Sequence, residues 1–236
     1  MARTRKSKSS RDRLRVKPLV RWALRLGLIS VVIVLGVIAL HREMNPPRPY
    51  YMGQEARRLG AIQHDWVPME RIAPIMARAV VAAEDANFCL HWGFDMAAIR
   101  TAIAEGTGRG ASTLSQQVVK NVYLWHGRNW ARKALEAVLT PVVETLWTKR
   151  RILEVYLNVA EFGEGVFGVE AAARHAFGVS ARELSDVQAA RLAAVLPAPK
   201  DRSAAKPSAA LRKRAAGILD GAATIRRDGR AACFED

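Results

Sequence analysis

Length, composition and charge restrict the class of protein. With 236 residues, of which 50% are apolar and six are Trp, the chain can form one substantial core, which argues against an intrinsically disordered protein. The net charge of +15 is uneven, because residues 1–25 contain ten Lys or Arg and one Asp, whereas residues 41–236 contain 27 basic and 21 acidic side chains. A basic tail carries most of the charge.

The basic tail, residues 1–21, precedes an apolar segment at 22–40. The only charge in that segment is Arg25, near one end, and as a helix it would be roughly 28 Å long, close to the hydrocarbon thickness of a bilayer. It is long for the apolar part of a cleaved signal peptide, and no small-x-small cleavage site follows. We predict a retained transmembrane helix at 22–40, with the tail in the cytoplasm. The tail would also suit a nucleic-acid arm, but a basic flank beside a spanning helix explains it better.

Helical patterns dominate the domain predicted at 54–236, which follows a Pro-rich linker at 41–53. Apolar residues recur at helical spacing over 72–83, and Pro74 fits the first turn of that helix. A shorter helix is predicted at 94–105. Since no alternating strand exceeds four or five residues, the predicted fold class is mainly α.

Later helices are predicted on both sides of a glycine-rich turn at 161–168. One helix spans 169–177, and Ser185 is a good N-cap for another that ends before Pro197. A basic stretch at 200–214 then precedes a last helix that ends near Asp228.

Two local features make further predictions. Pro141 should end or kink a helix near Thr140, because proline lacks the N–H that a helix interior needs. The helical pattern resumes from Glu144 to Asn158. Cys89 and Cys233 are the only cysteines, fewer than a disulfide scaffold uses, so we predict that they do not pair.

Two acids, Glu84 and Asp85, stand where the apolar helix of residues 72–83 ends. A carboxylate in that place is partly desolvated, which raises its pKa and suits a group that takes or gives a proton near neutral pH. The plain alternative is that both carboxylates are hydrated or paired at an ordinary helix end.

A flexible loop at 106–111 leads into the polar stretch 112–121. The loop matches no nucleotide-binding pattern and is instead predicted to be mobile near a long substrate. In the following helix, Gln117, Lys120 and Asn121 share one face by i, i+3, i+4 spacing. Such a face suits a sugar or a phosphate, although it would equally suit solvent.

A second group of charges lies at Arg132, Lys133 and Glu136. On a helix both cations stand one turn before the carboxylate, so the simplest interpretation is a local ion-pair cluster. Two adjacent cations would also suit a phosphate ligand.

Four stretches together resemble the signatures of one enzyme family, the peptidoglycan glycosyltransferases. They are Glu84–Gly93, Gly110–Asn121, Arg132–Glu136 and Lys149–Asn158. The chain is most similar to the monofunctional biosynthetic branch, which has a single membrane anchor and no transpeptidase domain. The resemblance implies a lysozyme-like helical domain with a small apolar lobe at the membrane.

The resemblance also implies a reaction and a set of site residues. The family polymerises lipid II, a lipid-diphosphate-linked disaccharide-pentapeptide, into β-1,4 glycan with inversion and release of the lipid diphosphate. Glu84 would be the general base and Glu136 the second carboxylate, which orients the diphosphate site. The implied substrate-binding residues are Ser112, Thr113, Gln117, Lys120, Asn121, Arg132 and Lys133. The implied supports of the site are Asp85, Phe88, His91 and Gly93.

The implied partners follow from the same family. They are lipid II, the growing glycan chain, the cytoplasmic (inner) membrane and, as further candidates, cell-division or elongation proteins, with no nucleic acid. The domain would lie on the extracytoplasmic side. No cofactor or metal ligand cluster is predicted, although a divalent cation at the diphosphate is compatible with the chemistry.

Two other functions compete with this interpretation. A lytic transglycosylase or lysozyme-like hydrolase also uses one Glu in a helical fold, but it has no use for a cationic diphosphate site. A membrane-tethered wall-binding protein without activity would need no base at all.

Overall fold

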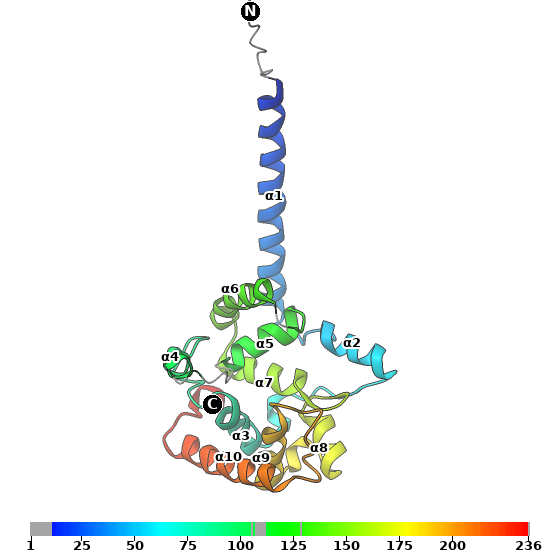
Figure 1. The fold of residues 1–236 in the computed structure, drawn as a ribbon, viewed down its shortest axis with the longest axis vertical. Coiled ribbons are helices and arrows are strands. Elements are labelled where there is room, and N and C mark those ends of the chain that lie inside the picture. Colours follow the sequence, from blue (N-terminus) through cyan, green and yellow to red (C-terminus); the bar gives the residue numbers. More distant parts are fainter. Residues whose placement is uncertain (1–10, 105, 107–111, 128, 236) are drawn as a thin grey trace, which may run out of the picture.

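The computed structural model describes residues 11–104, 106, 112–127 and 129–235, and this part of the chain is largely helical (Figure 1). Parts of the predicted tail and glycine loop, residues 1–10 and 107–111, lie outside the described residues. The helices are α1 (Arg11–Leu40), α2 (Tyr50–Leu59), α3 (Pro74–Glu84), α4 (Met96–Ala104), α5 (Leu114–Tyr123), α6 (Trp130–Leu146), α7 (Lys149–Val159), α8 (Val169–Phe177), α9 (Asp186–Val195), α10 (Ala209–Arg227) and α11 (Ala232–Glu235).

Three short strands form a small sheet in the order β1-β3-β2. Strand β1 (Gln63–His64) pairs in parallel with β3 (Val166–Phe167), and β3 pairs antiparallel with β2 (Glu161–Gly163). The predicted glycine-rich turn is therefore a hairpin. Single 3-10 turns occur at Met69–Arg71 and Ala181–Glu183.

Helix α3 packs against both α9 and α10, which also pack against each other. Its predicted pattern is confirmed, with Pro74 in the first turn and Met76, Ala79 and Val80 fully buried. Helix α9 is rich in alanine, and small side chains let helices approach closely. Since α3 is held on several sides, the position of its last residue, Glu84, is fixed by the core.

Helix α1 projects from the side of the domain where α5 and α6 lie, while α9 and α10 lie at the opposite end (Figure 1). By length and composition, Val20–Leu40 could cross a membrane. Its last turn is attached to the domain, because Ile38 is buried and its carbonyl accepts a hydrogen bond from Trp147 Nε1 at 2.7 Å. Arg151 also donates to the carbonyls of His41 and Met44.

Of the two outcomes predicted for Pro141, an end to the helix near Thr140 is wrong. Helix α6 continues through Pro141 to Leu146, and the break comes at Trp147, before the side chain of Thr148 caps α7. A proline inside a helix removes one hydrogen bond and crowds the preceding turn, which together cost about 3 kcal/mol, and packing on both sides of the proline can offset this cost. The helix is buried before Pro141 at Thr140 and after it at Val143.

Three other predictions need correction. Cys89 and Cys233 form a disulfide across 144 residues of sequence, because α10 and α11 return the chain to the loop after α3. The basic stretch 200–214 does not precede the last long helix, since α10 begins at Ala209. Helix α2 begins at Tyr50, inside the segment predicted as a linker.

Candidate active site

Glu84 lies at the C-terminal end of α3, with only 14% of its side chain exposed. Burial raises the pKa of this carboxyl group, because the charged form loses hydration. The hydrogen bond from Gln117 and the nearby charges of Arg214 and Lys120 lower it again in part. A carboxylate in this environment is able to exchange a proton closer to neutral pH than an ordinary glutamate.

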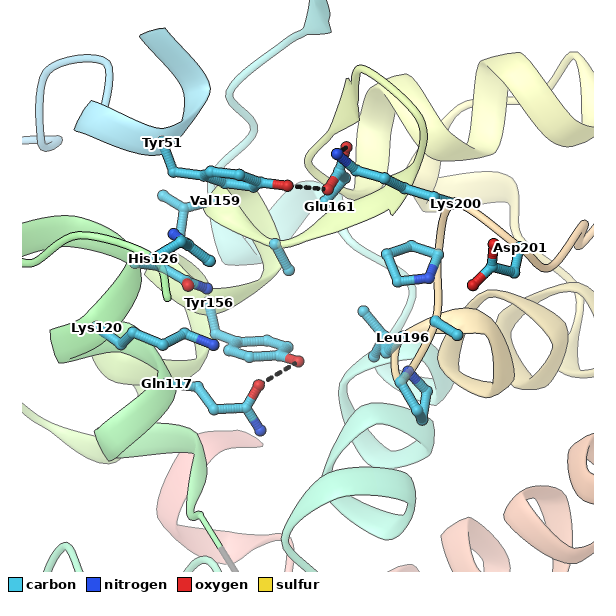
Figure 2. A pocket seen from close by; sticks show the side chains of 15 residues that line it. Tyr51, Gln117, Lys120, His126, Tyr156, Val159, Glu161, Leu196, Lys200 and Asp201 are labelled. Carbon is cyan, nitrogen blue, oxygen red and sulfur yellow. Dashed lines mark hydrogen bonds and ion pairs between the residues drawn. The ribbon is translucent and has the colours of Figure 1, made fainter. Parts of the chain in front are cut away.

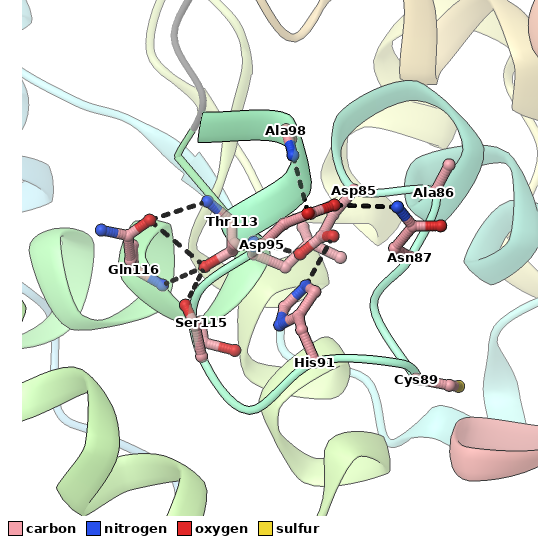
Figure 3. Close-up of polar contacts among 12 residues, drawn as sticks. Asp85, Ala86, Asn87, Cys89, His91, Asp95, Ala98, Thr113, Ser115 and Gln116 are labelled. Atoms are coloured by element: carbon pink, nitrogen blue, oxygen red, sulfur yellow. Dashed lines mark hydrogen bonds and ion pairs between the residues drawn. The ribbon is translucent and has the colours of Figure 1, made fainter. Parts of the chain in front are cut away.

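The loop after Glu84 is fixed by its neighbour, Asp85 (Figure 3). One oxygen of Asp85 accepts a hydrogen bond from His91 Nε2 at 2.8 Å, and the other accepts from the backbone N–H of Leu114 at 2.9 Å. Leu114 is the first residue of α5, where the helix dipole favours a negative charge. Asp85 therefore connects the end of α3 to the start of α5, and so helps to fix the backbone next to Glu84.

The loop also packs against α6 at Gly93. Its φ is +86°, and a Cβ atom there would lie 2.7 Å from the Cγ2 atom of Thr140, so only glycine fits. The carbonyl of Gly93 accepts a hydrogen bond from the Thr113 hydroxyl at 2.6 Å. Phe88, fully buried, packs under Lys149, whose Nζ lies 4.4 Å from the ring centroid.

Thr113 has a second contact that bears on its predicted function. It is the N-cap of α5, forms a capping box with Gln116 and is 2% exposed. Its hydroxyl is thus occupied by the protein itself. This geometry favours a supporting role over the substrate contact that the resemblance implies.

Helix α5 brings Gln117 and Lys120, two of the three polar side chains predicted on one face, close to Glu84. Gln117 Nε2 donates to Glu84 Oε2 at 3.1 Å, and the Gln117 carbonyl oxygen accepts from the Tyr156 hydroxyl at 3.4 Å. Burial lowers the pKa of Lys120, and Arg132 and Lys133 lower it further, while Glu136 and Glu84 oppose them. An anionic ligand beside Lys120 would raise this pKa again.

Arg132 and Lys133 both bind Glu136, which is 2% exposed. The Arg132 contact is 2.6 Å from Nη1 to Oε2, and Lys133 Nζ also donates to the hydroxyl of Ser112 at 3.2 Å. The predicted local ion-pair cluster is therefore present. It lies close enough to Lys120 for both cations to affect its pKa.

A cleft of about 370 Å³ opens beside Lys120 (Figure 2). Gln117, Lys120 and Asn121 line it from α5, together with Tyr156 from α7. A second cavity, of about 280 Å³, is lined by Glu84, Asp85, Ser112 and Thr113. Since Gln117 lines one cavity and Glu84 the other, their hydrogen bond lies between the two.

Several residues around the larger cleft are absent from the predicted set of site residues. Tyr51 donates to Glu161 Oε2 at 2.8 Å, and Lys200 lies 5.6 Å above the Tyr51 ring (Figure 2). His126 stacks on Tyr51 with the ring centroids 3.8 Å apart, and burial with nearby cations lowers its pKa to about 4. These residues come from four separate segments, so no local pattern could have grouped them.

Comparison with known proteins identifies the family. Residues 52–223 match the family model described as transglycosylase. The chain is 60% identical to the biosynthetic peptidoglycan transglycosylase of Jannaschia sp. (strain CCS1), over 98% of each chain. It is 44% identical to that of Caulobacter vibrioides, over 89% of this chain and 94% of the relative. The protein of Yersinia pestis (strain Pestoides F) is 53% identical, over 79% and 85%. The chain belongs to the transglycosylase family.

The matched transglycosylase region includes every residue of the two cavities except Tyr51. It begins two residues after the start of α2 and ends within α10. The domain described above is thus the enzyme domain of this family, and it is preceded by α1, which is long and apolar enough to cross a membrane.

The transglycosylase domain exposes large apolar side chains on the side that carries α1. On α6, the exposed fractions are 91% for Trp130 and 66% for Val138, and Trp125 is also exposed just before it. Figure 1 shows α6 directly at the base of α1. Exposed Trp next to a spanning helix is typical of a membrane interface, which agrees with the predicted apolar lobe.

Among the described residues, no group of three or more His, Cys, Asp and Glu side chains is placed to hold a metal ion. Glu136, near the cleft, binds Arg132 and Lys133. The cations of the cleft are suited to bind an anion directly.

Proposed function

We propose that this transglycosylase polymerises lipid II into β-1,4 glycan strands and releases the lipid diphosphate. The observation that carries the proposal is the pairing of a largely buried carboxylate, Glu84, with the cation Lys120 through the shared neighbour Gln117. An attacking hydroxyl requires a base and a departing diphosphate requires a cation, and here the two groups lie in neighbouring cavities on either side of Gln117.

In the proposed reaction, Glu84 removes the proton from the 4-hydroxyl of the acceptor sugar. The hydroxyl oxygen forms a bond to the anomeric carbon of the donor while the bond from that carbon to the diphosphate oxygen breaks. Attack from the face opposite the leaving group inverts the configuration from α to β. The proton remains on Glu84, and the electron pair leaves with the lipid diphosphate.

The cations stabilise the charge that develops on the leaving group. The charge of Lys120, which lines the larger cleft, acts on Glu84, and we propose that Lys120 contacts the diphosphate. Arg132 and Lys133 are held by Glu136 on the same side, so Glu136 would fix their positions. Gln117, Asn121 and Ser112 supply neutral polar groups for sugar hydroxyls or phosphate oxygens. The proposal includes no resident cofactor, and a divalent cation would be held by the diphosphate oxygens.

We also propose an orientation in the cytoplasmic membrane. The basic residues before Val20 stay in the cytoplasm, and the domain lies outside, where the growing glycan chain and any division or elongation proteins are found. The disulfide between Cys89 and Cys233 supports this orientation, since disulfides persist in oxidising compartments.

The product of the wild-type protein tests the proposal against hydrolysis. The full chain in detergent micelles or vesicles is supplied with lipid II in one reaction and with intact peptidoglycan in another. We expect glycan polymer and free lipid diphosphate from lipid II, and no release from the peptidoglycan. Soluble fragments from peptidoglycan without any polymer would instead show a lytic enzyme. An absence of both products under conditions where a related transglycosylase is active would favour a wall-binding protein.

A further inference from the structure

The two oxygens of Glu84 face different elements. Oε2 accepts the hydrogen bond from Gln117 of α5, whereas Oε1 lies 4.0 Å from Nη2 of Arg214 on α10. A separation of 4.0 Å is an ion-pair contact but is too long for a hydrogen bond. Oε1 is therefore close to a positive charge and still free to accept a proton.

The packing of α10 on α3 explains why Arg214 reaches this place. The buried face of α10 is formed at helical spacing by Leu211, Ala215, Ile218, Ala222 and Ile225. At Gly221 the two helices are close enough that a Cβ atom would lie 3.1 Å from the Cβ of Ala82. Arg214 precedes Gly221 by seven residues, two helical turns, and so lies on the same side of α10. Its position follows from the helix packing rather than from a flexible loop.

The other groups that face Glu84 do not replace Arg214. Asp85 is adjacent in the chain and its negative charge opposes ionisation of Glu84. The charge of Lys120 on α5 acts on Glu136 as well as on Glu84. The Tyr156 hydroxyl on α7 donates its hydrogen bond to Gln117. The cation on the α10 side is Arg214, and 38% of its side chain is exposed.

We propose that Arg214 is a positioning residue for the reaction, which keeps the Glu84 carboxylate ionised and turns Oε1 towards the acceptor hydroxyl. This rests on the proposed function of Glu84 as the general base. Gln117 holds one oxygen by a hydrogen bond and Arg214 attracts the other by charge, so the carboxylate is fixed from two helices. The guanidinium offsets part of the cost that burial imposes on the ionised form.

The test is the pH dependence of polymerisation in four full-length proteins. Arg214→Gln removes the charge, Arg214→Lys keeps it, and Lys213→Gln removes a neighbouring exposed charge that forms no ion pair within the described residues. Without Arg214 the pKa of Glu84 rises further, so the acid side of the kcat profile moves to higher pH. We expect Arg214→Gln to lose about three- to tenfold in kcat near pH 6 and less than about twofold near pH 9, with part of the loss near pH 6 restored in Arg214→Lys. The Lys213→Gln profile should match the wild type.

Two results would overturn the proposal. An Arg214→Gln profile that coincides with the wild type would show that the charge does not act on Glu84. A loss of equal size at every pH, together with no restoration by Arg214→Lys, would show that Arg214 only supports the fold. Thermal unfolding of each variant separates loss of folding from loss of ionisation. Failure of the proposed function is a different result, since Glu84→Gln would then remain active whatever the Arg214 variants do.

Discussion

The disulfide between Cys89 and Cys233 provides a quantitative prediction about stability. It joins the loop after Glu84 to α11, and the two cysteines are 144 residues apart in sequence. Closing a loop of that length in the unfolded chain reduces its entropy by an amount worth about 5 kcal/mol at 25 °C. Measured values for disulfides are usually smaller, about 2–4 kcal/mol, since the unfolded state retains structure.

Reduction should therefore lower the melting temperature of the domain substantially. For a protein of this size each kcal/mol corresponds to roughly 2–4 °C, so we expect a decrease of roughly 5–15 °C. The assay is thermal unfolding of the full chain in detergent micelles, followed by circular dichroism with and without reductant. The Cys89→Ser, Cys233→Ser double variant is the control: it should unfold at the temperature of the reduced wild type and should not respond to reductant.

Two observations would refute this reasoning. Equal melting temperatures for the oxidised and reduced wild type would show that the bridge does not restrict the unfolded chain. Alkylation of two free thiols in protein that was never exposed to reductant would show that the bridge does not form.

Three further predictions concern the site. Lys120→Met should lower kcat on the order of 100-fold at unchanged melting temperature, because the diphosphate loses a preorganised cation, and an unchanged kcat would contradict the assignment. Gly93→Ala should cost about 2–4 kcal/mol in denaturant unfolding, since its positive φ and the Cγ2 atom of Thr140 both exclude a Cβ; a variant as stable as wild type would contradict the packing. The base must be ionised and burial raises its pKa, so wild-type kcat should fall as pH drops through a value above that of an ordinary glutamate; a midpoint at or below the ordinary value would contradict the role of Glu84.

Much of the catalytic scaffold could be predicted from local sequence patterns. The helix ending at Glu84 follows from apolar periodicity and Pro74. The common face of Gln117 and Lys120 follows from helical geometry alone. These predictions are correct because each feature depends only on residues that are close together in the chain.

Other features of the fold and the site depend on contacts between segments that are far apart in the chain, so local sequence patterns do not predict them. Arg214 reaches Glu84 only because α10 packs across α3, and the cysteine pair forms only because α11 returns to the loop after α3. The hydrogen bond from Tyr51 to Glu161 likewise spans 110 residues. At Pro141 the tendency of proline to end a helix is outweighed by the packing of the surrounding residues, and α6 continues.

The central claim is that the Glu84 carboxylate is the base that activates the acceptor hydroxyl. The most direct test is the rate of glycan polymerisation from lipid II by wild type and Glu84→Gln, both full length, in the same vesicles. The account predicts that Glu84→Gln keeps the wild-type melting temperature and loses at least about 100-fold in rate, in line with the contribution of a general base. A folded Glu84→Gln protein that polymerises at close to the wild-type rate would contradict it.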